Sequence, residues 1–389
     1  MPTTTYKVAP ASPILASSLL STESGLPPDR KRPDADPNQT SKWDLRFDIE
    51  KGLLPSRSAS SSNEHDIFRP GAVIGFSSLR GRSLDGNEDE FVGELPRHLL
   101  TTWLRRTLPP LLGQTSSQPQ PQPHSRTRTY IIHPQHSTIF SPAKLLSSLV
   151  SRSGPTSYAP PLSRNAAITL LDAVQLFPVF DFAGAVDAIS DVGERLHKIW
   201  NDRQQNQNQN ENENEKEDKS QQTVVVIVGL DTLTEAVIRS SNAVRGTAVL
   251  TSALRTITQL SRMHRDYLSV LLVNTSGIGP SPSMHQHLNQ NQSQSQAQRE
   301  YETRYTRDDG IGIQSMFYAH VPLFLSLLMK TLDQGVDTHL LMSISDLSMD
   351  AHRRVAVPVV EVIKDRVGGG LGRWCVWNGK DSQQLEILY

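Results

Sequence analysis

The sequence predicts an α/β domain in which helices cover both faces of a wound, mostly parallel sheet. Two near-continuous apolar runs, "VVVIV" at 224–228 and "SVLLV" at 269–273, are typical of parallel strands that are buried on both faces. Strand and helix patterns alternate through the middle of the chain, and right-handed crossovers would wind them into one core. Three further β-type runs near the C-terminus predict hairpins, the last two joined by "GGGLG".

The strands and helices of the core follow from the hydrophobic periodicity, in chain order. Apolar residues at 3–4 spacing indicate a helix at 95–112 that Pro109 and Pro110 end. Ser141 is the expected N-cap of the next helix, with Pro142 in its first turn. The segment 166–200 is expected to form a strand, a loop and a helix, and another helix is expected at 246–265. The remaining strands are expected at 71–78, 129–134, 223–230 and 267–277.

Composition divides the chain into one domain and several polar segments. Residues 1–66 are rich in Ser, Pro and Asp and are predicted to be a disordered tail, apart from a docking element at 42–54. The core is expected at 67–389. Low-complexity insertions rich in Gln, Asn, Ser or Pro are expected at about 113–128, 203–222 and 278–309.

Bulk properties exclude several classes of protein. The net charge of −1 gives the whole molecule no attraction for nucleic acid, so such a contact would need a local basic patch. The single cysteine, Cys375, excludes an internal disulfide framework and a thiolate metal cluster, and we predict no metal site. No apolar run approaches the roughly 20 residues that span a bilayer, so no membrane contact is expected.

Four segments in a fixed order resemble the ATPase core of RecA-like recombinases, and most of all the paralogues of the eukaryotic strand-exchange protein. They are "TYIIHPQHSTIFSPAKLLSSLV", "LDTLTEAVIRSSNAVRG", "TITQLSRMHRDYLSVLLVNTSG" and the terminal pair "VDTHLLMSIS" and "VVEVIKDRVGGGLGRWCVW". Together they cover most of 67–389. The resemblance implies a RecA-like P-loop NTPase fold.

The phosphate-binding loop of that family, G-x-x-x-x-G-K-[S/T], is missing from this chain. Its place is occupied by "GFSSLRGRSLDGNEDEFVGEL", where Gly75, Gly81, Arg82 and Ser83 form only a degenerate version of the motif. A second frame, which begins at Gly93, puts a carboxylate in place of the lysine. Acidic residues in the same loop would repel a triphosphate unless magnesium intervened. We therefore expect no nucleotide cofactor, although ATP with magnesium is the ligand that a weak site would take.

Two polar positions at strand ends complete the candidate nucleotide site that the resemblance implies. Asp231 follows the strand at 223–230, where a catalytic acid could orient magnesium or water, and it would be the catalytic residue of an active enzyme. The favoured alternative is that Asp231 caps the next turn or helix. Asn274 occupies the position of the family's polar sensor, although it could instead satisfy backbone groups of its own loop.

A candidate DNA-binding segment lies at the end of the third insertion, in "REYETRYTRDDG". It interleaves Arg299, Arg304 and Arg307 with Tyr301 and Tyr305. Guanidinium groups can contact phosphates and tyrosines offer stacking faces, so single-stranded DNA is the ligand expected here, with a solvated linker as the alternative.

The resemblance implies a non-catalytic recombinase paralogue that acts in the nucleus, in DNA repair by homologous recombination. Its partners would be other RecA-like recombinase or paralogue subunits, together with weak contacts to single-stranded DNA. A basic run at 29–33, "DRKRP", could serve as an import signal. Two alternatives stay open: a structural pseudo-ATPase subunit of an Elongator-type tRNA-modification complex, and an ATP-dependent DNA-binding ATPase with an atypical loop.

Overall fold

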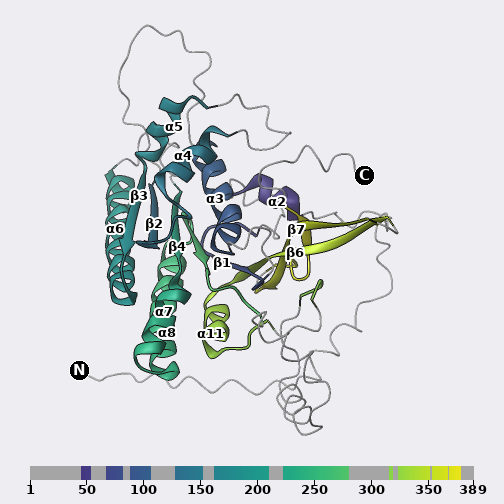
Figure 1. Ribbon diagram of the computed structural model, residues 1–389. Helices are drawn as coiled ribbons and strands as arrows, with labels where there is room; N and C mark the ends of the chain where they lie inside the picture. Colours follow the sequence, from purple (N-terminus) through teal and green to yellow (C-terminus); the bar gives the residue numbers. More distant parts are fainter. Residues whose placement is uncertain are drawn as a thin grey trace, which may run out of the picture. The chain divides into compact units, whose positions relative to one another are not determined.

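The computed structural model describes ten segments of the chain (Figure 1). They are residues 45–53, 67–81, 88–106, 128–151, 162–209, 222–279, 315–318, 323–350, 353–366 and 368–377. The three predicted insertions lie largely outside these segments. Parts of them belong to the core, because residue 128 opens a strand, residues 203–209 extend a helix, and residues 222 and 278–279 are buried or pair with neighbouring segments.

Eight strands form one sheet in the order β3-β2-β4-β5-β1-β6-β7-β8. All pairs from β3 to β6 are parallel, whereas β6 with β7 and β7 with β8 are antiparallel. The predicted α/β class, the mostly parallel sheet and the closing hairpins are thus confirmed. The strands are β1 Val73–Ser78, β2 Arg128–Pro134, β3 Val174–Val179, β4 Thr223–Val228, β5 Leu268–Val273, β6 Thr338–Asp350, β7 Arg353–Asp365 and β8 Trp374–Val376.

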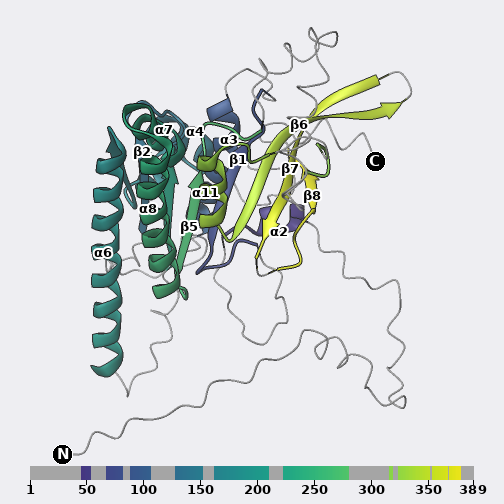
Figure 2. The same cartoon turned by 90° about the horizontal axis from the view of Figure 1, so that it is seen from below.

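Helices cover both faces of the sheet, as Figure 2 shows. One layer contains α3 Glu88–Arg106, α4 Pro142–Val150 and α5 Arg164–Leu171, and the other contains α6 Phe182–Gln209, α7 Leu230–Ser240, α8 Ala243–Met263 and α11 Leu327–Gly335. Apolar side chains of the second layer form a large core cluster with β1, β2, β4 and β5. Strands β1, β4 and β5 are buried at every residue, as their apolar sequences predict.

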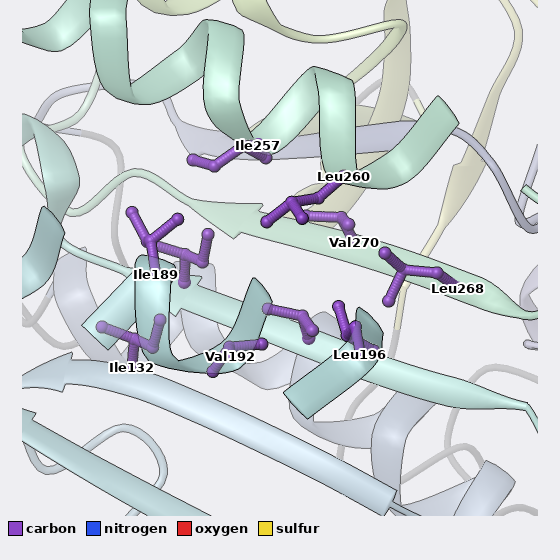
Figure 3. A pocket seen from close by; sticks show the side chains of 10 residues that line it. Ile132, Ile189, Val192, Leu196, Ile257, Leu260, Leu268 and Val270 are labelled. Atoms are coloured by element: carbon purple, nitrogen blue, oxygen red, sulfur yellow. The ribbon is translucent and has the colours of Figure 1, made fainter. Parts of the chain in front are cut away.

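Helices α6 and α8 leave a small cavity against the sheet (Figure 3). Its volume is about 10 Å³, close to the space of one water molecule. The side chains around it, including Ile189, Val192 and Leu196 from α6 and Ile257 and Leu260 from α8, are all apolar. Such a cavity offers no partner to a polar ligand and is a packing defect rather than a binding site.

Three elements differ from the sequence prediction. Helix α3 begins at Glu88, earlier than expected, because acidic residues suit the positive end of a helix. Residues 164–171 form the helix α5, capped by the Ser163 side chain on the amide of Ala166, and the expected strand comes later, as β3. Helix α4 starts at Pro142 as predicted, but the Ser141 side chain makes no capping hydrogen bond.

A folded element precedes residue 67, within the docking element at 42–54 that the sequence analysis excepted from the disordered tail. Residues Leu45–Lys51 form the helix α2, and Leu45, Ile49 and Leu53 are completely buried. Arg106, the last residue of α3, donates hydrogen bonds to the backbone carbonyls of Lys51 and, at 2.7 Å, Glu50. The C-terminal end of α2 is therefore held by a guanidinium group, which suits the negative end of a helix. The predicted docking element therefore packs against α3 of its own chain.

Candidate functional site

The candidate site lies at the edge of the sheet where the parallel strands β4, β5 and β1 end side by side. Ligands of open α/β sheets bind outside this carboxyl edge. Strand β4 leaves it through Gly229, whose φ of +69° belongs to the left-handed region that favours glycine. Leu230 and Asp231 then open α7. The sharp turn at Gly229 places the Asp231 carboxylate beside the end of β5.

Asp231 is completely buried, and its carboxylate accepts hydrogen bonds from the segment that follows β5. The Ser276 backbone amide donates to Oδ2 at 2.5 Å, and the Thr275 hydroxyl donates a long hydrogen bond of 3.4 Å to Oδ1. Burial raises the pKa of Asp231, although the hydrogen bonds from the 275–276 segment act in the opposite direction. Asp231 therefore joins the start of α7 to the segment that follows β5, and the N-cap position of α7 itself is Gly229.

The chain that leaves β1 forms backbone contacts with its neighbours instead of turning its amides toward a ligand. Leu79 forms a parallel bridge with Ile278, and its amide donates to the carbonyl of Met342 at 2.9 Å. The amide of Arg80 donates to Ile278 at 2.9 Å, and its guanidinium donates to the Ser276 carbonyl at 2.8 Å. A phosphate-binding loop needs free amides after this strand. The backbone amides of Leu79 and Arg80 already donate hydrogen bonds to carbonyl groups of this chain.

The glycines of the degenerate motif have separate structural roles. A Cβ atom on Gly75 would lie 2.9 Å from Cγ1 of Val336, so close packing favours glycine inside β1. Gly81 has a φ of +73°. Arg82 and Ser83 lie outside the described residues. Gly93 lies within α3, where a Cβ atom would meet Cγ2 of Ile139 at 2.2 Å, so the second frame of the motif does not form a loop.

One acidic side chain at the start of α3, that of Glu90, links α3 to α4. Glu90 accepts hydrogen bonds from Arg97, at 2.8 Å, and from Lys144 of α4. Burial alone would raise the pKa of Glu90, but these two cations outweigh it and lower the pKa below the ordinary value. Glu90 thus fixes the start of α3 against α4.

A second polar network runs from Asn274 and Ser77, at this edge, along the sheet toward the start of β6, and only Asn274 was among the residues predicted from the sequence. Asn274 Nδ2 donates to the Ser77 hydroxyl at 2.9 Å, and Ser77 Oγ lies 2.8 Å from Nε2 of His339 in β6. The other ring nitrogen of His339 lies 2.9 Å from Oδ1 of Asp333, a residue in the last turn of α11. Lys364 of β7 contacts the second carboxylate oxygen of Asp333 at 3.0 Å. The network therefore links β1, β5, β6, β7 and α11.

Charge and burial define the Asp333 end of this network. Burial would raise the pKa of Asp333, yet its hydrogen bond with His339 and the charge of Lys364 lower the pKa below the ordinary value. At the other end, Asn274 Oδ1 is buried and has no hydrogen-bond partner among the described residues. The same is true of the hydroxyl oxygen of Ser78.

The structure does not describe the candidate DNA-binding segment, and the described segments contain no metal-binding cluster and no membrane-spanning helix. Arg299, Tyr301, Arg304, Tyr305 and Arg307 lie outside the described residues. Within the described segments, no group of three or more His, Cys, Asp or Glu side chains is arranged to hold a metal ion. No helix of that part of the chain is both long and apolar enough to cross a membrane.

The whole sequence was also compared with known proteins. No protein-family model matches the chain, and the search of curated proteins found no significant match.

Proposed function

We propose that this chain is a non-catalytic RecA-like recombinase paralogue that acts in DNA repair by homologous recombination. The observation that carries the proposal is the state of Asp231, which is buried and hydrogen-bonded to the chain's own Ser276 amide at 2.5 Å. A hydrolytic carboxylate has to present an oxygen to magnesium or to the attacking water. Here both oxygens accept hydrogen bonds from residues 275–276.

The surroundings of Asp231 support the same proposal. The guanidinium group of Arg80 donates to the Ser276 carbonyl, so the segment that accepts the arginine also donates to the aspartate. This pairing stabilises the sheet edge through contacts within the chain, without the charge of a phosphate. A module of this kind would contribute to repair through protein contacts, as one member of an assembly whose other RecA-like subunits bind nucleotide. Contacts with single-stranded DNA would come from Arg299, Arg304 and Arg307.

Two measurements on the full chain test this function. The first is hydrolysis and binding of ATP with magnesium at millimolar concentration, for which we expect no activity. Hydrolysis that disappears in Asp231→Asn would instead favour the ATPase with an atypical loop. The matched control is Glu235→Gln, which changes a partly exposed carboxylate on the same helix.

The second measurement is affinity purification with mass spectrometry after DNA damage. Recovery of a strand-exchange protein or its paralogues, in the nuclear fraction, is the expected result. Recovery of tRNA-modifying subunits would instead favour the Elongator-type alternative. We expect the wild-type chain to bind single-stranded DNA weakly and in a salt-sensitive way. This affinity should fall when Arg299, Arg304 and Arg307 are changed to Ala. Unchanged binding would exclude this segment as the DNA contact.

A further inference from the structure

Ser77, His339 and Asp333 have the contacts of a nucleophile, a general base and an orienting carboxylate. Ser77 Oγ lies 2.8 Å from Nε2 of His339, and Nδ1 of the same ring lies 2.9 Å from Oδ1 of Asp333. Both distances fall within the range expected of an activated hydroxyl group and its base. Such a constellation is recognised by geometry and not by sequence position. It is separate from Asp231, and its chemistry does not depend on the function proposed above.

The directions of the hydrogen bonds agree with a nucleophilic role for Ser77. Asp333 has a lowered pKa and also contacts Lys364, so its carboxylate accepts the proton on Nδ1 of His339. With one ring proton placed there, Nε2 is an acceptor, and the Ser77 hydroxyl donates to it. Asn274 Nδ2 donates to the same Ser77 oxygen at 2.9 Å. That contact would stabilise negative charge as it develops on Oγ.

The position of Ser77 also matches a reactive group. It is the fifth residue of β1 and lies near the carboxyl end of a parallel strand, the edge at which α/β sheets bind ligands. Beside it, the Oδ1 atom of the buried Asn274 lacks a hydrogen-bond partner among the described residues. The polar side chains of Ser77 and Asn274 thus lie together at the end of the strand.

We propose that Ser77 is a nucleophile that accepts an acyl group from small acyl esters. In this step the Ser77 O–H bond breaks and its proton passes to Nε2 of His339. A bond forms between Oγ and the carbonyl carbon, and the ester C–O bond breaks, so that the leaving alkoxide or phenolate departs with the electron pair. No oxidant, reductant or metal is needed for the balance.

Burial sets the size of the acyl group. Ser77 has an exposed fraction of 0% and His339 of 1%, so a donor reaches the hydroxyl only when the sheet edge opens locally. The site should therefore take acetyl groups from a compact donor and exclude long acyl chains. The reaction should also be slow compared with that of an open active site.

The neighbouring residue provides a matched control within the same strand. Ser78 is 1% exposed, has the same chemistry, and its hydroxyl has no hydrogen-bond partner among the described residues. Ser78 follows Ser77 in the strand and therefore points to the opposite face of the sheet, so it reports the background reactivity of a buried serine hydroxyl that has no imidazole to remove its proton. A merely structural hydrogen bond between Ser77 and His339 would give the two serines the same low reactivity.

The test is acetylation of the folded full-length chain by p-nitrophenyl acetate, with the release of p-nitrophenolate followed by absorbance and the acetylated residues mapped by mass spectrometry. We expect acetylation of Ser77 and not of Ser78. This comparison can be made in the wild-type protein, without any variant. Ser77→Ala should abolish the acetylation at this position, and His339→Gln should slow it about a hundredfold. Ser78→Ala should leave the rate unchanged.

Circular dichroism of each variant separates loss of the reaction from loss of the fold. Failure of Ser77 to be acetylated in folded wild-type protein would overturn the proposal, and so would equal labelling of Ser77 and Ser78. A His339→Gln variant that folds and reacts at the wild-type rate would also overturn it. None of these results bears on ATP hydrolysis or partner recovery, so failure here and failure of the proposed function can be distinguished.

Discussion

Asp231 gives the sharpest prediction, because a structural carboxylate and a catalytic one respond differently to the same substitutions. Asp231→Ala removes the acceptor of the Ser276 amide, which lies 2.5 Å away in a buried position. A buried donor left unpaired costs about 1–3 kcal/mol, and hydrogen bonds to charged groups lie toward the upper end. We expect the free energy of unfolding to fall by about 2–3 kcal/mol. Urea denaturation followed by far-UV circular dichroism measures this change.

Asp231→Asn should behave differently, because it keeps a side-chain oxygen for the Ser276 amide and removes the buried charge. Its new amide group can donate to the hydroxyl of Thr275, which now donates to the carboxylate at 3.4 Å. We expect a free energy of unfolding within about 1 kcal/mol of wild type at pH 7, because the main hydrogen bond is retained. Glu235→Gln, on the exposed side of α7, is the control and should change stability by no more than about 0.5 kcal/mol.

The pH dependence of these variants follows from the direction of the pKa shift. Burial raises the pKa of Asp231 above its ordinary value of 3.8, so the folded protein favours the protonated carboxyl group. The contribution of this group to stability therefore falls as the pH rises from about 3.8 through the folded pKa. Asp231→Asn should remove that dependence. An Asn variant as unstable as the Ala variant would refute this reasoning, because it would show that the negative charge itself is required.

Three further predictions test other parts of the fold. Burial, together with the nearby arginine charges, lowers the pKa of His98 from 6.5 to about 4. The wild-type protein should therefore lose roughly 3 kcal/mol of stability as the pH falls from 6.5 to about 4. In a His98→Gln variant, stability should depend less on pH over this range. Arg106→Gln removes the contacts with the last carbonyls of α2, so amide hydrogen exchange in α2 should become faster, whereas Arg46→Gln on the exposed face should leave exchange nearly unchanged. Val192→Ile adds a methylene beside the apolar cavity and should raise the free energy of unfolding by about 0.5–1 kcal/mol, whereas Val186→Ile, more exposed on the same helix, should have little effect.

Hydrophobic pattern was sufficient to predict most of the sheet. Strands β1, β2, β4 and β5 lie where continuous apolar runs placed them, because a parallel strand covered on both faces has to be apolar throughout. The pattern was ambiguous for residues 164–171, since "AAITLL" fits a buried strand and a buried helix equally well. The segment containing α2 could be recognised as a docking element, but its docking site could not, because it is formed by the distant α3 and β8.

The candidate site was predictable only where its residues follow strands. Asp231 and Asn274 could be found because polar residues after apolar strands gather at one edge of a parallel sheet. The pair formed by Ser77 and His339 could not be found in this way, since the two residues are 262 positions apart and belong to β1 and β6. Neither local sequence resembles a known nucleophile motif. Only the parallel pairing of β1 with β6 brings the hydroxyl group and the imidazole together.

The two networks divide the carboxyl edge of the sheet into parts with different chemistry. Toward β4, the side chains of Asp231 and Arg80 are both paired with residue 276, so this part gains little from binding an anion. Toward β6, the Ser77 hydroxyl is paired with an imidazole while Oδ1 of Asn274 stays unpaired among the described residues. A polar network with one unpaired acceptor is less stable than one that is complete, because the buried atom has lost its hydration. The part of the edge toward β6 thus differs from the part toward β4, because it holds a hydroxyl group that is paired with an imidazole.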